Sequence, residues 1–263
     1  MKKTILITGA GSGIGLDSAW ALAARGHRVI ATTFDDVQAQ ALQAMASARG
    51  VPLEVFKLDI TSQDDRQKVL SFELDVLINN AGVGESGSLA EVDVDRIRQV
   101  FEVNLFATLE LTQLALHGMI ARRRGTVLFV SSIAGRVPMP FLMPYSMSKF
   151  ALSAAGAGLR AELKQLRCHV HVALIEPGAI HTGFNQAMTE RKYTWMDPQS
   201  YFSAHVERLK AQEKRTFGLL EAKSTRSIVA QIVKAAEANR PKLRYVAPWI
   251  QGVGVRLARI FGV

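Results

Sequence analysis

Residues 4–15, TILITGAGSGIG, decide the fold of this chain. They open with an apolar run, Ile5 to Ile7, which is typical of a short buried strand that ends before Gly9. A helical pattern follows from Ile14 to Arg25, and Gly26 stands where a helix C-terminus favours glycine. A glycine-rich turn between strand and helix lets a pyrophosphate approach the positive helix N-terminus. The stretch therefore predicts the start of a nucleotide-binding βαβ unit.

The spacing of the glycines departs from the usual G-x-G-x-x-G pattern, because Ile14 occupies the place of the third glycine. A glycine-rich loop without any ligand is the alternative interpretation. The position of the turn inside a βαβ unit at the N-terminus favours a cofactor site.

Further strands and helices alternate along the chain. The pattern predicts strands at 29–33, 53–58, 76–78, 126–130 and 170–175, and helices at 37–48, shortly after 58, at 89–124 with at least one break, and at 145–166. Alternation of this kind, with β-branched strands, indicates a doubly wound parallel sheet, Rossmann-like, in three α/β/α layers. No linker divides the chain, so we expect a single domain over 1–263.

Composition narrows the class of protein. The chain has 263 residues, 48% of them hydrophobic, and no apolar run long enough for a membrane helix or a signal peptide, so we expect a cytoplasmic protein. The single Cys168 excludes an intrachain disulfide and fits a reducing compartment. The formal charge of +9 is spread out, its one dense run being residues 122–124, so no nucleic-acid partner is expected. No metal site is predicted.

The stretch PFLMPYSMSKF, residues 140–150, places Tyr145 and Lys149 one helical turn apart. Each residue alone has an ordinary structural interpretation, a core tyrosine and a solvated lysine. Together they suit proton transfer, because a nearby cation favours the phenolate and so lowers the pKa of a tyrosine. Ser132, at the end of the fifth strand, would donate a hydrogen bond to a substrate oxygen.

Several motifs in order resemble the short-chain dehydrogenase/reductase family. The matching elements, which run from Thr4 to Thr182, are Thr8-Gly9-x-x-x-Gly13-x-Gly15, Asp59 in KLDIT, NNAG at 79–82, Asn104 in VNLFA, Ser132 in SSIAG, Tyr145-x-x-x-Lys149, LRAEL at 159–163, and Pro177-Gly178 followed by Thr182. Their order and spacing are more specific than any one of them.

The resemblance implies an NAD(P)-dependent oxidoreductase that interconverts an alcohol and a ketone or aldehyde. Tyr145 would be the general acid/base, Lys149 its activator and a ribose ligand, Ser132 the oxygen stabiliser, and Asn104 the anchor of a relay water. The implied cofactor contacts are Thr8, Gly9, Gly11, Ser12, Gly13, Ile14, Gly15, Thr33, Asp59, Ile60, Asn80, Ala81, Gly82, Tyr145, Lys149, Pro177, Gly178, Ile180 and Thr182. Among them Asp59 would face the adenine and Thr182 the carboxamide.

The choice between NAD and NADP stays open. NAD recognition uses an acidic residue at the end of the second strand, and NADP recognition a basic one nearby. Thr33 stands at the acidic position and Phe34 at the basic one, while Asp35 and Asp36 come slightly late.

The segment before Tyr145 and the loop after Thr182 are both apolar and rich in Met and aromatic residues. In the family that this chain resembles, these two stretches flank the substrate. The candidate substrate contacts are Ser132, Met139, Leu142, Tyr145, Phe184 and Met188, with residues 183–225 as a lid. They suit a lipophilic alcohol or ketone, and the region resembles members that act on steroids or retinoids. Packing as a plain lid or subunit contact is the alternative.

The C-terminal segment, 245–263, is apolar and carries Arg256 and Arg259. A packed helix, a dimer contact and a weak association with a membrane surface all fit it. The resemblance implies a homodimer or homotetramer that pairs through helices near 100–119 and 148–165. Two rival functions are a non-catalytic NAD(P)-sensing or scaffold protein, and an epimerase or dehydratase. The complete catalytic set opposes the first, and the short segment after Thr182 opposes the second.

Overall fold

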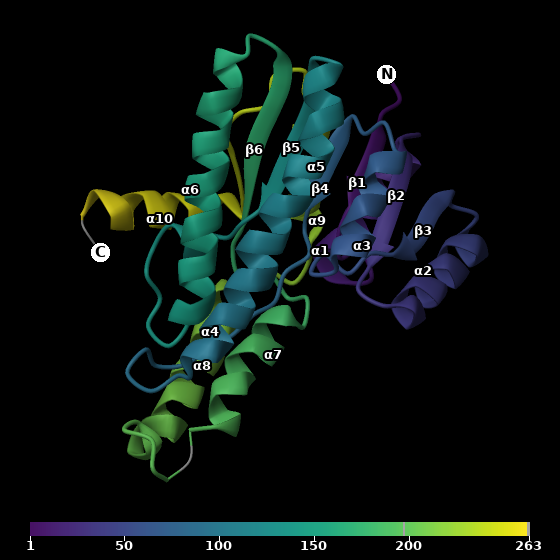
Figure 1. The fold of residues 1–263 in the computed structure, drawn as a ribbon. Helices are drawn as coiled ribbons and strands as arrows, with labels where there is room; N and C mark the ends of the chain where they lie inside the picture. The colour runs from purple at the N-terminus through teal and green to yellow at the C-terminus, as the bar shows by residue number, and fades with distance from the viewer. Residues whose placement is uncertain (197, 262–263) are drawn as a thin grey trace.

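The computed structural model describes residues 1–196 and 198–261, and its centre is a parallel sheet of seven strands (Figure 1). The spatial order is β3-β2-β1-β4-β5-β6-β7, and all neighbouring strands are parallel. The strands are β1 (Thr4–Ile7), β2 (Arg28–Thr33), β3 (Leu53–Lys57), β4 (Val76–Asn79), β5 (Arg124–Val130), β6 (His169–Pro177) and β7 (Arg244–Ala247). The predicted doubly wound α/β fold is confirmed.

Successive strand residues point to opposite faces of the sheet, and in this sheet both sets are apolar. Helices therefore cover both faces. Ile5 and Ile7 belong to one core cluster and Leu6 to the other. The helices are α1 (Gly13–Ala24), α2 (Asp36–Arg49), α3 (Gln63–Gln67), α4 (Val94–Phe101), α5 (Thr108–Ala121), α6 (Met143–Gln165), α7 (Phe184–Arg191), α8 (Val206–Leu220), α9 (Arg226–Glu237) and α10 (Trp249–Ile260). Both strand faces are thus buried, which explains the nearly continuous apolar strand sequences.

Two predicted boundaries were wrong. The helical region placed at 89–124 begins only at Val94, and its helix α5 ends at Ala121, so Arg124 starts β5 instead. Its predicted break is a π-helix, Glu102–Ala107. The seventh strand, β7, was not predicted at all, because it is only four residues long and lies in an apolar segment close to Pro248.

β1 and β4 are neighbours in the middle of the sheet. On one side of this pair the chain adds β2 and β3 outward, and on the other side it adds β5, β6 and β7, so the strand order reverses here. Ligands of such sheets bind at the carboxyl ends of the strands at this reversal. The glycine turn follows β1 there, and the segment 79–82 begins with the last residue of β4 and continues beyond it. The two motifs predicted to hold the cofactor are therefore neighbours.

The predicted lid, residues 183–225, contains α7 and α8 rather than an irregular loop. In Figure 1 both helices lie at one end of the sheet, beyond the carboxyl ends of the central strands. None of the helices among the described residues is long and apolar enough to span a membrane.

Candidate active site

The glycine turn needs its glycines for close backbone approach. Gly9 has a φ of +64°, and a Cβ on it would lie 2.9 Å from the Cα of Ala81. A Cβ on Gly15 would lie 2.4 Å from both the Asn80 side chain and the Gly9 carbonyl oxygen. Asn80 donates from Nδ2 to the carbonyls of Thr8 and Gly9, each at 2.9 Å. The turn is therefore fixed to the end of β4 on one side and stays open on the other.

That open side faces a cavity of about 770 Å³. Most of the residues predicted to contact a cofactor line it: Gly9, Gly11, Ser12, Gly13, Ile14, Asp59, Ile60, Asn80, Ala81, Gly82, Tyr145, Lys149, Pro177, Gly178, Ile180 and Thr182. The cavity thus runs from the glycine turn to the tyrosine and lysine of α6. In the sequence, Gly15 of the turn and Tyr145 are 130 residues apart.

Three predicted contacts, Thr8, Gly15 and Thr33, lie behind the cavity wall and not in it. The Thr8 Oγ1 accepts hydrogen bonds from the backbone N–H groups of Asn80 and Ala81, both at 3.0 Å. Thr33 is fully buried, and its hydroxyl donates to the Asp35 carbonyl at 3.0 Å. These residues support the site from behind, and their direct contact with a cofactor stays a prediction.

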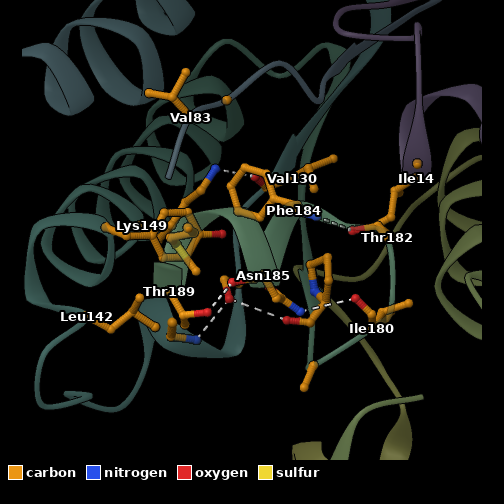
Figure 2. A pocket seen from close by; sticks show the side chains of 18 of the residues that line it. Ile14, Val83, Val130, Leu142, Lys149, Ile180, Thr182, Phe184, Asn185 and Thr189 are labelled. Atoms are coloured by element: carbon orange, nitrogen blue, oxygen red, sulfur yellow. Dashed lines mark hydrogen bonds between the residues drawn. The ribbon is translucent and has the colours of Figure 1, made fainter. Parts of the chain in front are cut away.

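Helix α6 brings Tyr145 and Lys149 to one face, as the four-residue spacing predicts. The Lys149 ammonium lies 5.6 Å from the centre of the Tyr145 ring. It donates to the Val130 carbonyl at 3.0 Å (Figure 2). Gly135 allows the turn after β5 to pack on this helix, since a Cβ there would lie 2.6 Å from the Lys149 carbonyl oxygen. The end of β5 and the start of α6 therefore hold each other in register.

Ser132 lies between β5 and the 3-10 turn Ile133–Gly135, whose N-cap it forms by accepting from the Ala134 N–H at 3.0 Å. Its hydroxyl donates to the Pro177 carbonyl at 3.4 Å and also lies near enough to Tyr145 to act on the pKa of that phenol. The two hydroxyls thus converge on one point of the cavity wall, where a substrate oxygen would contact both.

The pKa values differ from the sequence-based prediction that Lys149 lowers the pKa of Tyr145. Burial raises the pKa of Tyr145 to about 12, and the hydrogen bond from Ser132 only partly opposes this. Burial also lowers the pKa of Lys149, to about 8. Removal from water therefore dominates both groups, and Tyr145 is held as a protonated phenol, the form that donates a proton.

Asn104 lies in the π-helix between α4 and α5, and its side chain is only 1% exposed. Its Oδ1 accepts from the Val83 N–H at 2.8 Å, and its Nδ2 donates to the Val83 carbonyl at 2.9 Å and to the Ser148 Oγ at 3.0 Å. Ser148 in turn donates to the Tyr145 carbonyl at 2.7 Å. Both amide protons are thus used to tie the segment after β4 to the first turn of α6.

We expect Asn104→Ala to lower the free energy of unfolding by about 3 kcal/mol, because it removes three hydrogen bonds and leaves buried polar groups unpaired. Urea denaturation of the cofactor-free protein measures this change. The matched control is Asn185→Ala on the lid, which removes a single hydrogen bond to the Ile180 carbonyl. Equal stability of the two variants would contradict the tying role of Asn104.

Apolar side chains surround Tyr145 in the cavity. Met188 packs with Tyr145 and Ala134 in one buried cluster, with Met139, Leu142 and Phe184 around it. The rings of Phe184 and Tyr145 are 5.8 Å apart and tilted. All four predicted apolar contacts, Met139, Leu142, Phe184 and Met188, line the cavity.

The lid adds a polar wall that the sequence did not indicate. Lys192 is 1% exposed, lines the cavity, and pairs with Glu213 of α8 at 2.5 Å. Glu213 also accepts from the Tyr193 hydroxyl at 2.8 Å. Further lining residues from α8 are Arg208, Leu209, Gln212, Thr216, Phe217 and Leu220. Their spacing of three and four places them on one helix face, but nothing local in the sequence says what that face covers.

The opposite end of the cavity was also incompletely predicted. Phe34 and Gln38 line it, although Thr33 does not. Asp35 is the N-cap of α2 and accepts from the Gln38 backbone N–H at 2.7 Å and from its side chain at 3.2 Å. Among the described lining residues this end carries no cation, and its one carboxylate is Asp59.

A doubly wound sheet with a buried serine, tyrosine and lysine in a cavity that reaches the glycine turn defines a dinucleotide-dependent oxidoreductase. The family model of the short chain dehydrogenases matches residues 3–193, and the chain therefore belongs to this family. Its fold and its order of motifs agree with this membership.

Known relatives are similar over nearly the whole chain. Human retinol dehydrogenase 8 is 32% identical over 253 residues, which are 92% of this chain and 80% of that protein. Human 17-beta-hydroxysteroid dehydrogenase type 1 is 33% identical over 256 residues, with 93% and 77% covered. A short-chain dehydrogenase from Streptomyces avermitilis superposes with a TM-score of 0.81 at 25% identity, covering 99% of this chain and 93% of the other.

Proposed function

We propose that this protein interconverts a lipophilic secondary alcohol with its ketone, or an aldehyde with its alcohol, using NAD(P)(H). The observation that carries the proposal is that Ser132, Tyr145 and Lys149 share one cavity with an apolar wall and the glycine turn. The names of the relatives, a retinol and a hydroxysteroid dehydrogenase, support a lipophilic substrate.

The cavity fits a dinucleotide on its own geometry. The backbone of the glycine turn leaves open space that side chains would fill, since a Cβ on Gly11 would lie 2.9 Å from the Gln38 side chain. The N-terminus of α1 points its free N–H groups at this space, which suits a pyrophosphate. When bound, the nicotinamide supplies or accepts the hydride.

The protein's own residues manage the proton. Tyr145, held protonated by burial, donates its phenolic proton to the carbonyl oxygen as that oxygen gains charge. Ser132 donates a hydrogen bond to the same oxygen and stabilises the developing negative charge. Lys149 offers a positive charge one turn away, which stabilises the phenolate left behind. In the reverse direction the phenolate accepts the proton of the alcohol.

The cavity also restricts the substrate. Its wall is apolar around Tyr145 and carries on the lid the ion pair of the buried Lys192 with the half-buried Glu213. A molecule with a lipophilic body and a further polar group matches both walls, because this ion pair offers hydrogen bonds that an entirely apolar ligand leaves unused.

The test has two steps. A fluorescence titration with NADH and NADPH identifies the tighter cofactor, and turnover is then measured with a panel of retinoid aldehydes, steroid ketones and short-chain ketones. We expect kcat/KM to be highest for the large lipophilic substrates. Turnover confined to the short-chain ketones would contradict the substrate class, and no turnover with cofactor bound would contradict the enzyme.

We expect Phe34→Arg to tighten NADPH binding about tenfold relative to NADH, through a charge-assisted hydrogen bond to the 2′-phosphate. The reason is that Phe34 is 60% exposed at a cavity end without a cation among its described lining residues. Dissociation constants for both cofactors measure the effect, with Val37→Arg on the exposed side of α2 as control. Equal gains for NADH and NADPH would place residue 34 away from the phosphate.

We further propose a homodimer or homotetramer that pairs through α5 and α6. Phe106, Ile120 and Phe150 are large apolar residues that are between 36% and 51% exposed on or beside these helices. Burying them against a second copy would remove that apolar surface from water.

A further inference from the structure

The helix α10 presents an apolar face to solvent. It follows β7 and extends sideways from the body, with the C-terminus at its outer end (Figure 1). The α10 apolar face consists of Trp249, Ile250, Val253, Leu257, Ile260 and Phe261, which are between 42% and 76% exposed. A helix on the surface of a soluble protein normally turns its polar side outward. Here the outward side is apolar and requires an explanation.

The helical arrangement makes this face continuous. Residues 249, 253, 257 and 260 follow one another at intervals of three and four, so they line up along one side. The buried residues of α10 are Gly252 and Val255, which lie on the opposite side of the helix wheel. The α10 apolar face therefore remains free while the other side packs on the protein.

The surroundings of this face are basic. The sequence contains no Asp or Glu after Glu237, whereas Arg240, Lys242, Arg244, Arg256 and Arg259 all follow it. None of the ion pairs found among residues 1–196 and 198–261 includes Arg256 or Arg259. On the helix wheel Arg256 lies beside the apolar face, whereas Arg259 lies on the side of Gly252 and Val255.

Further positive charge lies at the base of the helix. Arg136 and Arg244 both pair with the fully buried Glu176, which leaves this group with a net positive charge. The pKa of Arg136 is lowered by burial first, and the charges of Arg244 and Arg259 lower it further, so Arg259 is close to the same group. The positive charge is thus concentrated at α10.

We propose that the α10 apolar face docks on the surface of an anionic lipid bilayer. The apolar side chains would enter the boundary between headgroups and acyl chains, and Arg256 beside them would contact the anionic headgroups. Arg259, on the other side of the helix, would add to the positive field near the bilayer surface. With 12 residues α10 is too short to cross a bilayer, which needs about 20. A second copy of the chain is the less favoured occupant, because pairing two such faces would bring like charges together.

The position of α10 connects this surface to the cavity, an extension that rests on the proposed function. Gln251 lines the cavity, accepts from the Ala179 N–H at 2.8 Å and donates to the Leu220 carbonyl at 2.7 Å. Leu219 and Leu220 at the end of α8 are exposed. A docked bilayer would therefore lie close to the cavity entrance and could deliver a lipophilic substrate from the membrane.

The experiment is sedimentation of the full-length protein with vesicles of phosphatidylcholine, with or without phosphatidylglycerol. We expect binding to the phosphatidylglycerol vesicles that weakens with added salt. The double variant Arg256→Gln with Arg259→Gln should bind about thirtyfold more weakly, since each basic residue near an anionic surface contributes about fivefold. Arg25→Gln with Arg28→Gln removes the same charge at exposed positions elsewhere and should change binding little.

The apolar part has its own variant. Ile250→Gln, Leu257→Gln and Ile260→Gln together should abolish vesicle binding, whereas Val37→Gln with Leu70→Gln, at exposed positions outside α10, should not. Thermal unfolding shows whether each variant is folded. Trp249 is a second readout, because its fluorescence should shift to the blue on vesicle binding and the shift should be absent in Trp249→Phe.

Two results would overturn the proposal. One is vesicle binding by the triple variant that equals that of the unchanged protein. The other is a pair of observations: sedimentation velocity shows a lower oligomeric state for the triple variant, and vesicles do not bind the unchanged protein. That result would assign the face to a second copy of the chain. Neither readout depends on turnover, so a failure here is distinguishable from a failure of the proposed function.

Discussion

Tyr145→Phe is expected to lower kcat by about a thousandfold or more, since a positioned general acid contributes roughly 10² to 10⁴ and no other cavity residue described here offers a phenolic proton. Phenylalanine keeps the ring that packs against Phe184 and in the cluster with Met188. The variant therefore removes only the hydroxyl. The dissociation constant of the cofactor should stay within a few fold, because the glycine turn is untouched.

The measurement is steady-state turnover with the best lipophilic substrate, together with a fluorescence titration of the cofactor. Tyr245→Phe is the matched control: Tyr245 is equally buried, but its hydroxyl accepts from the Lys242 N–H, outside the cavity. That variant should turn over normally. Unchanged kcat in Tyr145→Phe would refute the assignment of the proton donor, even if the cofactor binds as expected.

Local signals explain why so much of the fold could be predicted. The β1–α1 unit has its apolar run, its glycine turn and the positive-φ Gly26 within 23 residues, so neighbouring residues suffice to define it. Tyr145 and Lys149 are fixed by the period of one helix. By contrast β7 is a short strand whose partner, β6, is about 70 residues away in sequence. No local pattern contains that pairing.

The differences between the predicted site and the cavity have a similar origin. Thr33 and Thr8 have the right sequence position for cofactor contact, but both are buried behind the residues that line the cavity, a placement that depends on the twist and packing of the sheet. The α8 wall depends on how the lid folds over the cavity. The rise in the pKa of Tyr145 depends on burial by several elements together, which spacing along the sequence does not reveal.

Lys149→Met is expected to lower kcat by about a hundredfold or more while it stabilises the folded protein. The loss of activity follows because the variant lacks the positive charge near the phenolate. The gain in stability follows from burial, which lowers the pKa of Lys149 from 10.5 to about 8. That shift corresponds to about 3 kcal/mol by which the charged form is disfavoured in the folded state, at about 1.4 kcal/mol per pKa unit.

The pH dependence gives the sign of this effect. Between about pH 8 and pH 10.5 the folded protein has lost the Lys149 proton and the unfolded chain still holds it, so the contribution of Lys149 to stability rises with pH over this range. Below pH 8 both states are protonated and the full penalty applies.

Urea denaturation without cofactor should therefore show the largest advantage of Lys149→Met near pH 7, and a smaller one near pH 10. Lys164→Met, at an exposed position on the same helix, should show neither the advantage nor its pH dependence. An advantage that stays constant from pH 7 to pH 10 would mean that packing of the methionine, and not the buried charge, accounts for it. If the stability advantage of Lys149→Met declines between pH 7 and pH 10, the folded protein gives up stability to keep a cation beside the proton donor.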